Sequence, residues 1–244
     1  MSGSGDGQAA SSAAPPEPAP DCPSAPAVIL SALVVLGSFA ALFHIDIPIL
    51  RFLRSYNLSA LQSLGDFGEK LGNGGTLIAI SLLLLGAGFL LKRQAWMQIA
   101  LDSLLAHGMV AIAVNSLKHI IGRPRPRLTH SGGWHWWPSL ESGLDSFPSG
   151  HTSATVAVAT VLARALPRLR WVPFALAVWV GASRIWRGSH FPGDVVGGMA
   201  LGFVVGSVCN EPLREWRQSG SWALVRVAPI VLLLTGLFWV LTHR

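Results

Sequence analysis

Charged residues are scarce in this sequence. Asp, Glu, Lys and Arg make up 12% of its 244 residues, and 51% of the residues are hydrophobic; a soluble domain usually carries about 25% charged residues. Because the core of a bilayer contains no water, a chain of this composition satisfies its backbone polar groups within membrane-crossing helices. The composition disfavours a soluble domain and predicts an all-α, multi-pass transmembrane helical bundle.

Other features are also missing. The two cysteines, Cys22 and Cys209, form neither a disulfide framework nor a metal-ligand spacing. Residues 1–26 contain no Lys or Arg, which a signal peptide needs, so we expect a disordered tail before a membrane domain at 27–241. The net charge of +6 comes from residues between apolar runs. This distribution disfavours nucleic acid as a partner and favours membrane topology and an anionic substrate.

Long apolar runs fill the predicted membrane domain. A span needs about 20 apolar residues, and runs near this length lie at Ala27–Phe43, Gly74–Leu91, Trp96–Ile121, Thr152–Leu166, Trp171–Trp186, Val195–Cys209 and Leu224–Leu241. Between the first two, Ile47–Leu64 mixes apolar and polar residues, a pattern typical of a helix lying in the membrane surface. Basic clusters follow the second, fourth and sixth runs, at Lys92–Arg93, Arg164–Arg170 and Arg214–Arg217. The positive-inside rule places these three connections in the cytoplasm.

The connections on the opposite side are also basic, which breaks the rule unless their cations have a local function. They carry Lys118, Arg123, Arg125, Arg127, Arg184 and Arg187. Taken alone, Lys118 and Arg125 at the end of the third run are typical of cations that reach from a helix end to the interface. Their number on one side is the first indication of an anion-binding site.

The stretch Pro148–His151 (PSGH) has two interpretations. It fits a helix N-terminus, with Ser149 as N-cap and His151 as an interfacial polar residue. It also fits a phosphate site, because a helix N-terminus offers free N–H groups and Gly150 lets an anion approach the backbone. In the later stretch Ser183–Asp194, His190 stands four residues before Asp194. Asp194 is either an N-cap or the acceptor of the Nδ1 proton of His190, which would leave Nε2 free to attack.

The three stretches share one order and one side of the predicted membrane: Lys118-x6-Arg125-Pro126, then Pro148–His151, then Ser183-Arg184-x5-His190-x3-Asp194. This pattern resembles the type 2 phosphatidic acid phosphatase (PAP2) superfamily of membrane lipid phosphatases. The resemblance covers a motif core at 96–209 and implies six core spans. The run Leu224–Leu241 is a candidate seventh span outside that pattern.

The resemblance implies a reaction on a lipid phosphate or diphosphate at the outer leaflet. Lys118, Arg125 and Arg184 would neutralise the phosphate oxygens, with Ser149 and the Gly150 N–H completing the site. His190 would form a phosphohistidine, Asp194 would stabilise its imidazolium, and His151 would act as acid and then base. No cofactor or metal is expected. The implied location is a cell membrane, such as a bacterial inner membrane, with the site facing the periplasm or exterior.

Several residues and alternatives lie outside this pattern. Arg123, Arg127, Arg187 and Lys70 are candidate contacts to a phosphorylated headgroup, although the extra arginines equally suit anionic lipid and Lys70 suits an exposed ion pair in a turn. Asp102 and His107 fit either a functional pair or a pair that braces the bundle. A lipid phosphotransferase and a non-enzymatic membrane protein that binds anions or lipids stay open as functions, as do the particular lipid and the oligomeric state.

Overall fold

The computed structural model describes residues 37, 41–53, 55, 62–129 and 138–209. Chain contacts divide the protein into Met1–Ser38 and Phe39–Arg244, and everything below concerns the second unit. The predicted tail at 1–26, the basic cluster Arg214–Arg217 and the candidate span Leu224–Leu241 lie outside the described residues.

This part of the chain is all-helical. A helix over residues 41–53 precedes α2 (Gln62–Gly72), α3 (Gly74–Leu90), α4 (Gln94–Ile121), α5 (Gly150–Ala165), α6 (Trp171–Trp186) and α7 (Pro192–Val208), with a short 3-10 turn, η2 (Pro167–Leu169), between α5 and α6. Helices α3 to α7 coincide with five of the predicted apolar runs. The turn predicted around Lys70 is wrong, because Lys70 belongs to α2.

The bundle is apolar outside as well as inside. Large exposed hydrophobic side chains include Leu83, Leu90, Trp171 and Phe203. Among the described helices, α4 alone is long and apolar enough to cross a membrane by itself, and α2 with α3 qualifies if the pair, bent by 59°, is one span. Helices α5, α6 and α7 have 16, 16 and 17 residues, so helix length does not establish the predicted number of spans.

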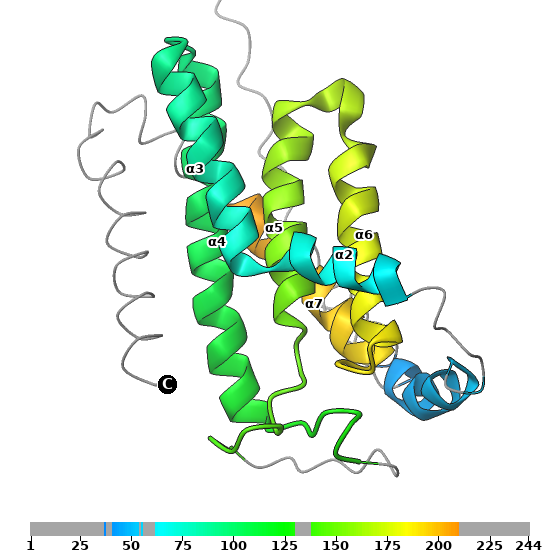
Figure 1. Cartoon of the computed structure of the whole chain (residues 1–244). Helices are drawn as coiled ribbons and strands as arrows, with labels where there is room; N and C mark the ends of the chain where they lie inside the picture. The colour runs from blue at the N-terminus through cyan, green and yellow to red at the C-terminus, as the bar shows by residue number, and fades with distance from the viewer. Residues whose placement is uncertain (1–36, 38–40, 54, 56–61, 130–137, 210–244) are drawn as a thin grey trace, which may run out of the picture. The chain divides into compact units, whose positions relative to one another are not determined.

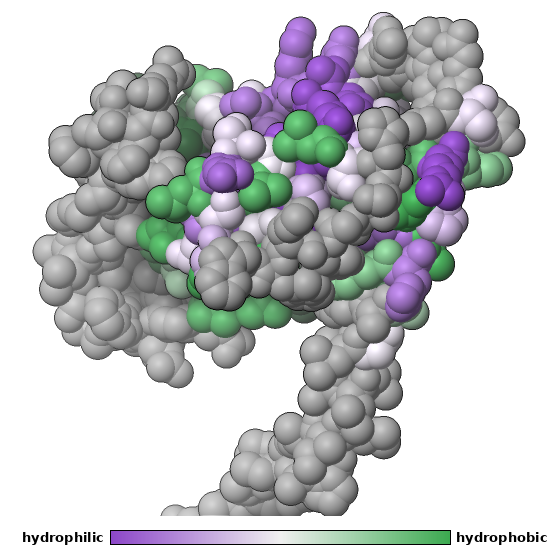
Figure 2. Space-filling model, turned by 90° about the horizontal axis from the view of Figure 1, so that it is seen from below, coloured by the Kyte–Doolittle hydropathy of each residue, from purple (hydrophilic) through white to green (hydrophobic). Residues whose placement is uncertain are grey.

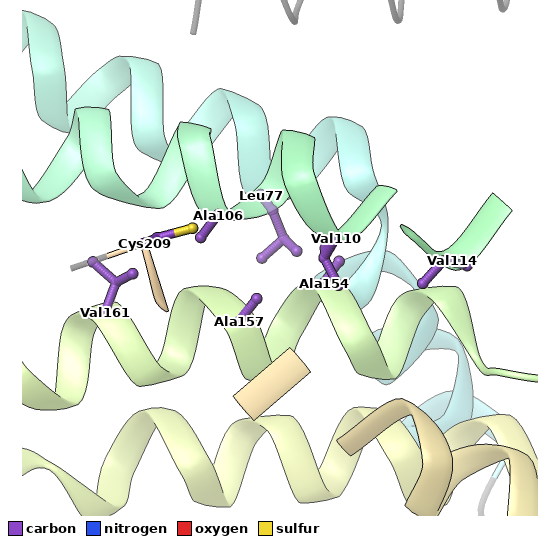
Figure 3. Packing of buried hydrophobic residues seen from close by; sticks show 8 residues of the cluster. All are labelled: Leu77, Ala106, Val110, Val114, Ala154, Ala157, Val161 and Cys209. Carbon is purple, nitrogen blue, oxygen red and sulfur yellow. The ribbon is translucent and has the colours of Figure 1, made fainter. Parts of the chain in front are cut away.

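The interior is built from small side chains. One core cluster joins α3, α4, α5 and the end of α7 (Figure 3), and consists of Leu77, Ala106, Val110, Val114, Ala154, Ala157, Val161 and Cys209. Alanine and valine fill most of these positions, which lets the helix backbones approach closely.

Helix α7 packs on α5 through a glycine stripe. Gly198, Gly202 and Gly206 are spaced four apart, and a Cβ at Gly202 would lie 2.3 Å from the backbone oxygen of Ser153. No side chain fits there, so glycine allows the close approach. The stripe holds the N-terminal ends of α5 and α7 together, and the Ser149 N–H donates to the Asp194 carbonyl at 3.0 Å.

All three sequence motifs therefore reach one end of the bundle. Helix α4 ends there at Gly122, whose left-handed conformation (φ 60°) stops the helix before the Arg-Pro-Arg-Pro segment. Helices α5 and α7 begin at the same end and α6 finishes there (Figure 1). Viewed from this end, hydrophilic and hydrophobic residues lie side by side, with strongly hydrophilic ones at the upper edge and at the right of the view (Figure 2).

Candidate active site

His190 lies in the short connection between α6 and α7 and is 3% exposed. Its Nδ1 is 2.8 Å from the backbone carbonyl oxygen of Ser146. A carbonyl only accepts, so Nδ1 carries the proton and the lone pair of the neutral ring is on Nε2. Burial lowers the pKa of His190; Asp194 opposes this shift, and the positive charges of Lys118 and Arg125 add to it. The ring is therefore neutral near pH 7 and able to act as a nucleophile.

Asp194 supports His190 differently from the expected direct hydrogen bond. Its Oδ2 is 3.6 Å from Nδ1, beyond hydrogen-bonding distance, and the Ser146 carbonyl takes that position instead. The fully buried carboxylate accepts from the Ser146 hydroxyl at 2.5 Å and from the Phe191 N–H at 2.9 Å. Asp194 thus caps α7 from its third position and fixes the residue that orients His190, while its charge stays close enough to stabilise an imidazolium.

Two of the predicted phosphate-binding cations share a carboxylate that the motifs did not reveal. Arg125 binds Asp145 through Nε at 2.8 Å and Nη2 at 2.6 Å, and the Lys118 ammonium is 3.5 Å from the same carboxylate. Burial alone would raise the pKa of Asp145, but the hydrogen bonds and charges of Arg125 and Lys118 outweigh it and lower the pKa to about 2. Asp145 is therefore ionised at any working pH.

The third cation, Arg184, is buried at the end of α6 and has incomplete hydrogen bonding. Its Nη1 lies 3.4 Å from Glu69 of α2, yet Nε and Nη1 are buried without a hydrogen-bond partner. The Nε2 of His151, in the first turn of α5, is also buried and without a partner. His151 lies within electrostatic range of Arg184, His190 and Lys118. The fold thus brings side chains from all three motifs into one site.

Ser149 and Gly150 form the start of α5. Ser149 is the N-cap residue and is fully buried, but its hydroxyl accepts from Thr152 at 3.0 Å instead of capping a backbone N–H. A Cβ at Gly150 would make only an ordinary contact, 3.6 Å from Val114. Packing therefore does not require glycine at this position, and Gly150 itself places no side chain beside its N–H.

The extra cations have separate positions. Arg123 is 3% exposed and donates to Asp194 at 2.5 Å and to Asp46 at 2.6 Å, so its interpretation as a headgroup contact is wrong. Arg127 is exposed and donates to the Ser189 hydroxyl at 3.1 Å. Arg187 pairs with Asp66 and Glu69 of α2. Lys70 is exposed on α2, and the headgroup hypothesis stays a prediction for it, Arg127 and Arg187.

Asp46 is a buried carboxylate that no motif indicated. It comes from the helix over 41–53, binds Arg123, and accepts from the Gly193 N–H at 2.7 Å. It therefore connects the N-terminal helix to Arg123 and to the first turn of α7. A series of buried contacts thus runs from Asp46 through Arg123 and Asp194 to Ser146. The carbonyl of Ser146 is the group that orients His190.

We expect Asp46→Ala to destabilise the protein strongly. The change removes the acceptor of Arg123 Nη2 and of the Gly193 N–H, while Arg123 Nη1 keeps Asp194. Breaking a buried ion pair typically costs about 3–5 kcal/mol. Thermal unfolding of the purified protein in detergent measures the effect. Asp46→Asn keeps an oxygen for Gly193 and should lose less. An alanine variant that unfolds at the wild-type temperature would contradict the assigned role of Asp46.

Comparison with known proteins places this geometry in a family. The PAP2 superfamily model matches residues 99–217. The lipid A 1-phosphatase of Rhizobium etli is 34% identical over 160 residues, which cover 59% of this chain and 68% of that protein. The decaprenylphosphoryl-5-phosphoribose phosphatase of Mycobacterium tuberculosis is 33% identical over 162 residues, covering 63% of this chain and 79% of that one.

A solved structure of a PAP2-type phosphatase has a similar fold. The crystal structure of a transmembrane PAP2-type phosphatidylglycerolphosphate phosphatase from Bacillus subtilis superposes with a TM-score of 0.59 at 26% identity, covering 76% of this chain and 96% of that one. The family model and these relatives define a phosphatase of the PAP2 type. The chain belongs to the PAP2 superfamily and is a phosphoric monoester hydrolase.

Proposed function

We propose that the protein removes a phosphate from a membrane lipid through a phosphohistidine on His190. The observation that carries this proposal is the set of unpartnered buried atoms on Arg184 and His151. Buried polar groups are nearly always hydrogen-bonded. Here Nε and Nη1 of Arg184 and Nε2 of His151 have no hydrogen-bond partner, although Arg184 forms an ion pair with Glu69, and two further cations lie nearby. A phosphate group supplies several charged acceptor oxygens and suits the fork of a guanidinium.

The reaction proceeds in two displacements. Nε2 of His190 attacks phosphorus, the bond from phosphorus to the lipid oxygen breaks, and that oxygen takes a proton from His151. Water then attacks the phosphohistidine, the phosphorus–nitrogen bond breaks, and His151 takes the proton from the water. Lys118, Arg125 and Arg184 stabilise the charge on the equatorial oxygens throughout.

The glycine at the first position of α5 supports phosphate binding at the start of this helix. The first N–H groups of a helix lack helical partners and point toward an approaching anion. Packing does not require glycine at position 150. A glycine there instead lets an anion approach the backbone closely. Ser149 and the Gly150 N–H therefore complete the phosphate site.

The substrate class is a lipid with a terminal phosphate or diphosphate. Relatives are named for lipid A, phosphatidylglycerophosphate and undecaprenyl diphosphate, and all of these carry a phosphate on a hydrophobic anchor. The apolar surface of the helices gives such an anchor access from the bilayer.

We expect purified protein to release phosphate from a panel of these lipids in excess chelator, because three side-chain cations supply the positive charge. Orthovanadate, which mimics pentacoordinate phosphorus on a histidine, should inhibit. Released phosphate and lipid products are measured together. Loss of activity on chelation that Mg²⁺ restores would contradict the mechanism. A phosphorylated lipid acceptor in place of free phosphate would make the protein a transferase.

The site is proposed to face the outside of the cell, because Lys92, Arg93 and the basic residues around Arg168 lie at the other ends of the helices. In a chain with Cys22 and Cys209 replaced by alanine, Ser142→Cys should react with an impermeant thiol reagent on intact cells. Arg168→Cys, also exposed, should react only after lysis. The opposite labelling pattern would place the site in the cytoplasm.

A further inference from the structure

Asp145 is placed where a carboxylate competes with the expected substrate. It lies in the connection that precedes the phosphate-binding turn, and its oxygens bind the Nε–Nη2 edge of Arg125 and approach Lys118. The side chains of Asp145 and Arg125 are each 28% exposed, so the pair is partly accessible to solvent rather than enclosed in the core. This pair uses Nε and Nη2 of Arg125 and does not use Nη1.

Backbone contacts fix this arrangement on both sides. The Arg125 N–H donates to the Gly143 carbonyl at 2.8 Å, two residues before Asp145. The next residue, Ser146, donates its N–H to the Arg123 carbonyl at 2.9 Å and accepts from His190. Asp145 and Arg125 are thus held opposite each other by the same segments that orient His190, which distinguishes the pair from an ion pair between two flexible side chains on a surface.

We propose that Asp145 is a positioning residue that holds Arg125 and Lys118 side by side and offsets part of their charge, so that the site releases inorganic phosphate after each turnover. The proposal rests on the proposed function. It assigns two effects to one carboxylate. The bidentate contact orients the guanidinium, and the negative charge lowers the affinity of the site for any anion.

The charge effect follows from the number of cations. Without Asp145, a phosphate would meet Lys118, Arg125 and Arg184 with one carboxylate fewer to offset their charge; Glu69, 3.4 Å from Arg184, and the buried Asp194 would remain. Such a site binds phosphate tightly and turns over slowly, because product release then limits the rate. A like charge near the phosphate weakens its binding, and at a partly exposed position a single charge changes affinity on the order of tenfold.

The test measures binding of inorganic phosphate and orthovanadate to the full-length protein in detergent, by calorimetry and as competitive inhibition. Asp145→Asn should lower the dissociation constant for phosphate about tenfold, strengthen inhibition by phosphate, and lower kcat with a lipid substrate. Glu141→Gln removes an exposed carboxylate from the same connection and should leave the phosphate affinity unchanged. A purely structural role would weaken phosphate binding instead of strengthening it.

Unchanged or weaker phosphate binding in a folded Asp145→Asn protein would overturn the proposal. If the asparagine variant does not fold, Asp145→Ser removes the same charge and should show the same tighter binding. Failure of the proposed function would look different, because the wild-type protein itself would then neither bind vanadate nor release phosphate from any lipid in the panel.

Discussion

His190→Ala should abolish phosphate release from every substrate, with a loss of at least about 10⁴-fold, because it removes the nucleophile rather than an accessory group. The loss should not depend on the leaving group, since no phosphoenzyme forms with any ester. Initial rates with a lipid phosphate and with p-nitrophenyl phosphate measure it. The side chain is buried beside Ser146 and Asp194, so thermal unfolding must confirm that the variant folds.

A matched control is available at the same end of the bundle. His119, in the last turn of α4, contacts the Ser139 carbonyl at 3.1 Å and belongs to none of the groups assigned to the reaction. His119→Ala should keep the wild-type rate within about a few-fold, as most substitutions outside a site do. An active His190→Ala protein would remove this histidine from the mechanism.

His151→Ala should show a loss that depends on the leaving group. A lipid alkoxide needs a proton as it departs, whereas p-nitrophenolate departs unassisted. General acid–base catalysis contributes typically about 10²–10⁴-fold. We therefore expect a loss of this size in the first displacement with a lipid ester and a much smaller loss with p-nitrophenyl phosphate. Single-turnover rates of leaving-group release separate this step from hydrolysis of the phosphoenzyme.

Equal losses with the two substrates would contradict the assignment of His151 as the acid. Partial retention of turnover with both would indicate that water or another group supplies the proton. His151→Gln is a second variant that keeps a polar group in the first turn of α5. It should behave as the alanine variant does, because an amide cannot transfer the proton.

Continuous apolar runs made the helices predictable. The run Trp171–Trp186 matches α6, and the run Gly74–Leu91 extends only one residue past α3. The runs coincide with helices because a membrane-facing or buried helix has few positions for polar residues. The residues grouped at the site were also predictable, since Lys118, His151 and His190 belong to motifs whose spacing has a direct chemical meaning. The grouping required only that four helix ends meet on one side.

Three carboxylates near the site, Asp46, Glu69 and Asp145, were not predictable in the same way. Asp46 is 77 residues from Arg123 in sequence, and Glu69 belongs to a segment with no motif of its own. Their partners are set by how the 41–53 helix and α2 pack against the bundle, and no local pattern encodes that packing. Arg123 was misassigned for this reason: beside Arg125 it looks like a surface cation, and only the fold buries it.

The orientation of His190 shows the same limit. The spacing of four residues correctly brought Asp194 near the ring, but it did not reveal that the Ser146 carbonyl intervenes at 2.8 Å. A backbone acceptor leaves no sequence signal. The hydrogen bonds of Asp194 to Ser146 and Phe191 explain why a carboxylate is needed there even without a direct bond to Nδ1.

Trapping of the phosphoenzyme tests the central claim most directly. His151→Ala protein is mixed with p-nitrophenyl phosphate, quenched in alkali, in which a phosphohistidine survives, and digested for mass spectrometry. The loss of the base that activates water should allow the intermediate to accumulate. We predict one phosphate per trapped chain on Nε2 of His190, and none in the His190→Ala protein. A phosphate on another residue, or one that forms without His190, would contradict the mechanism.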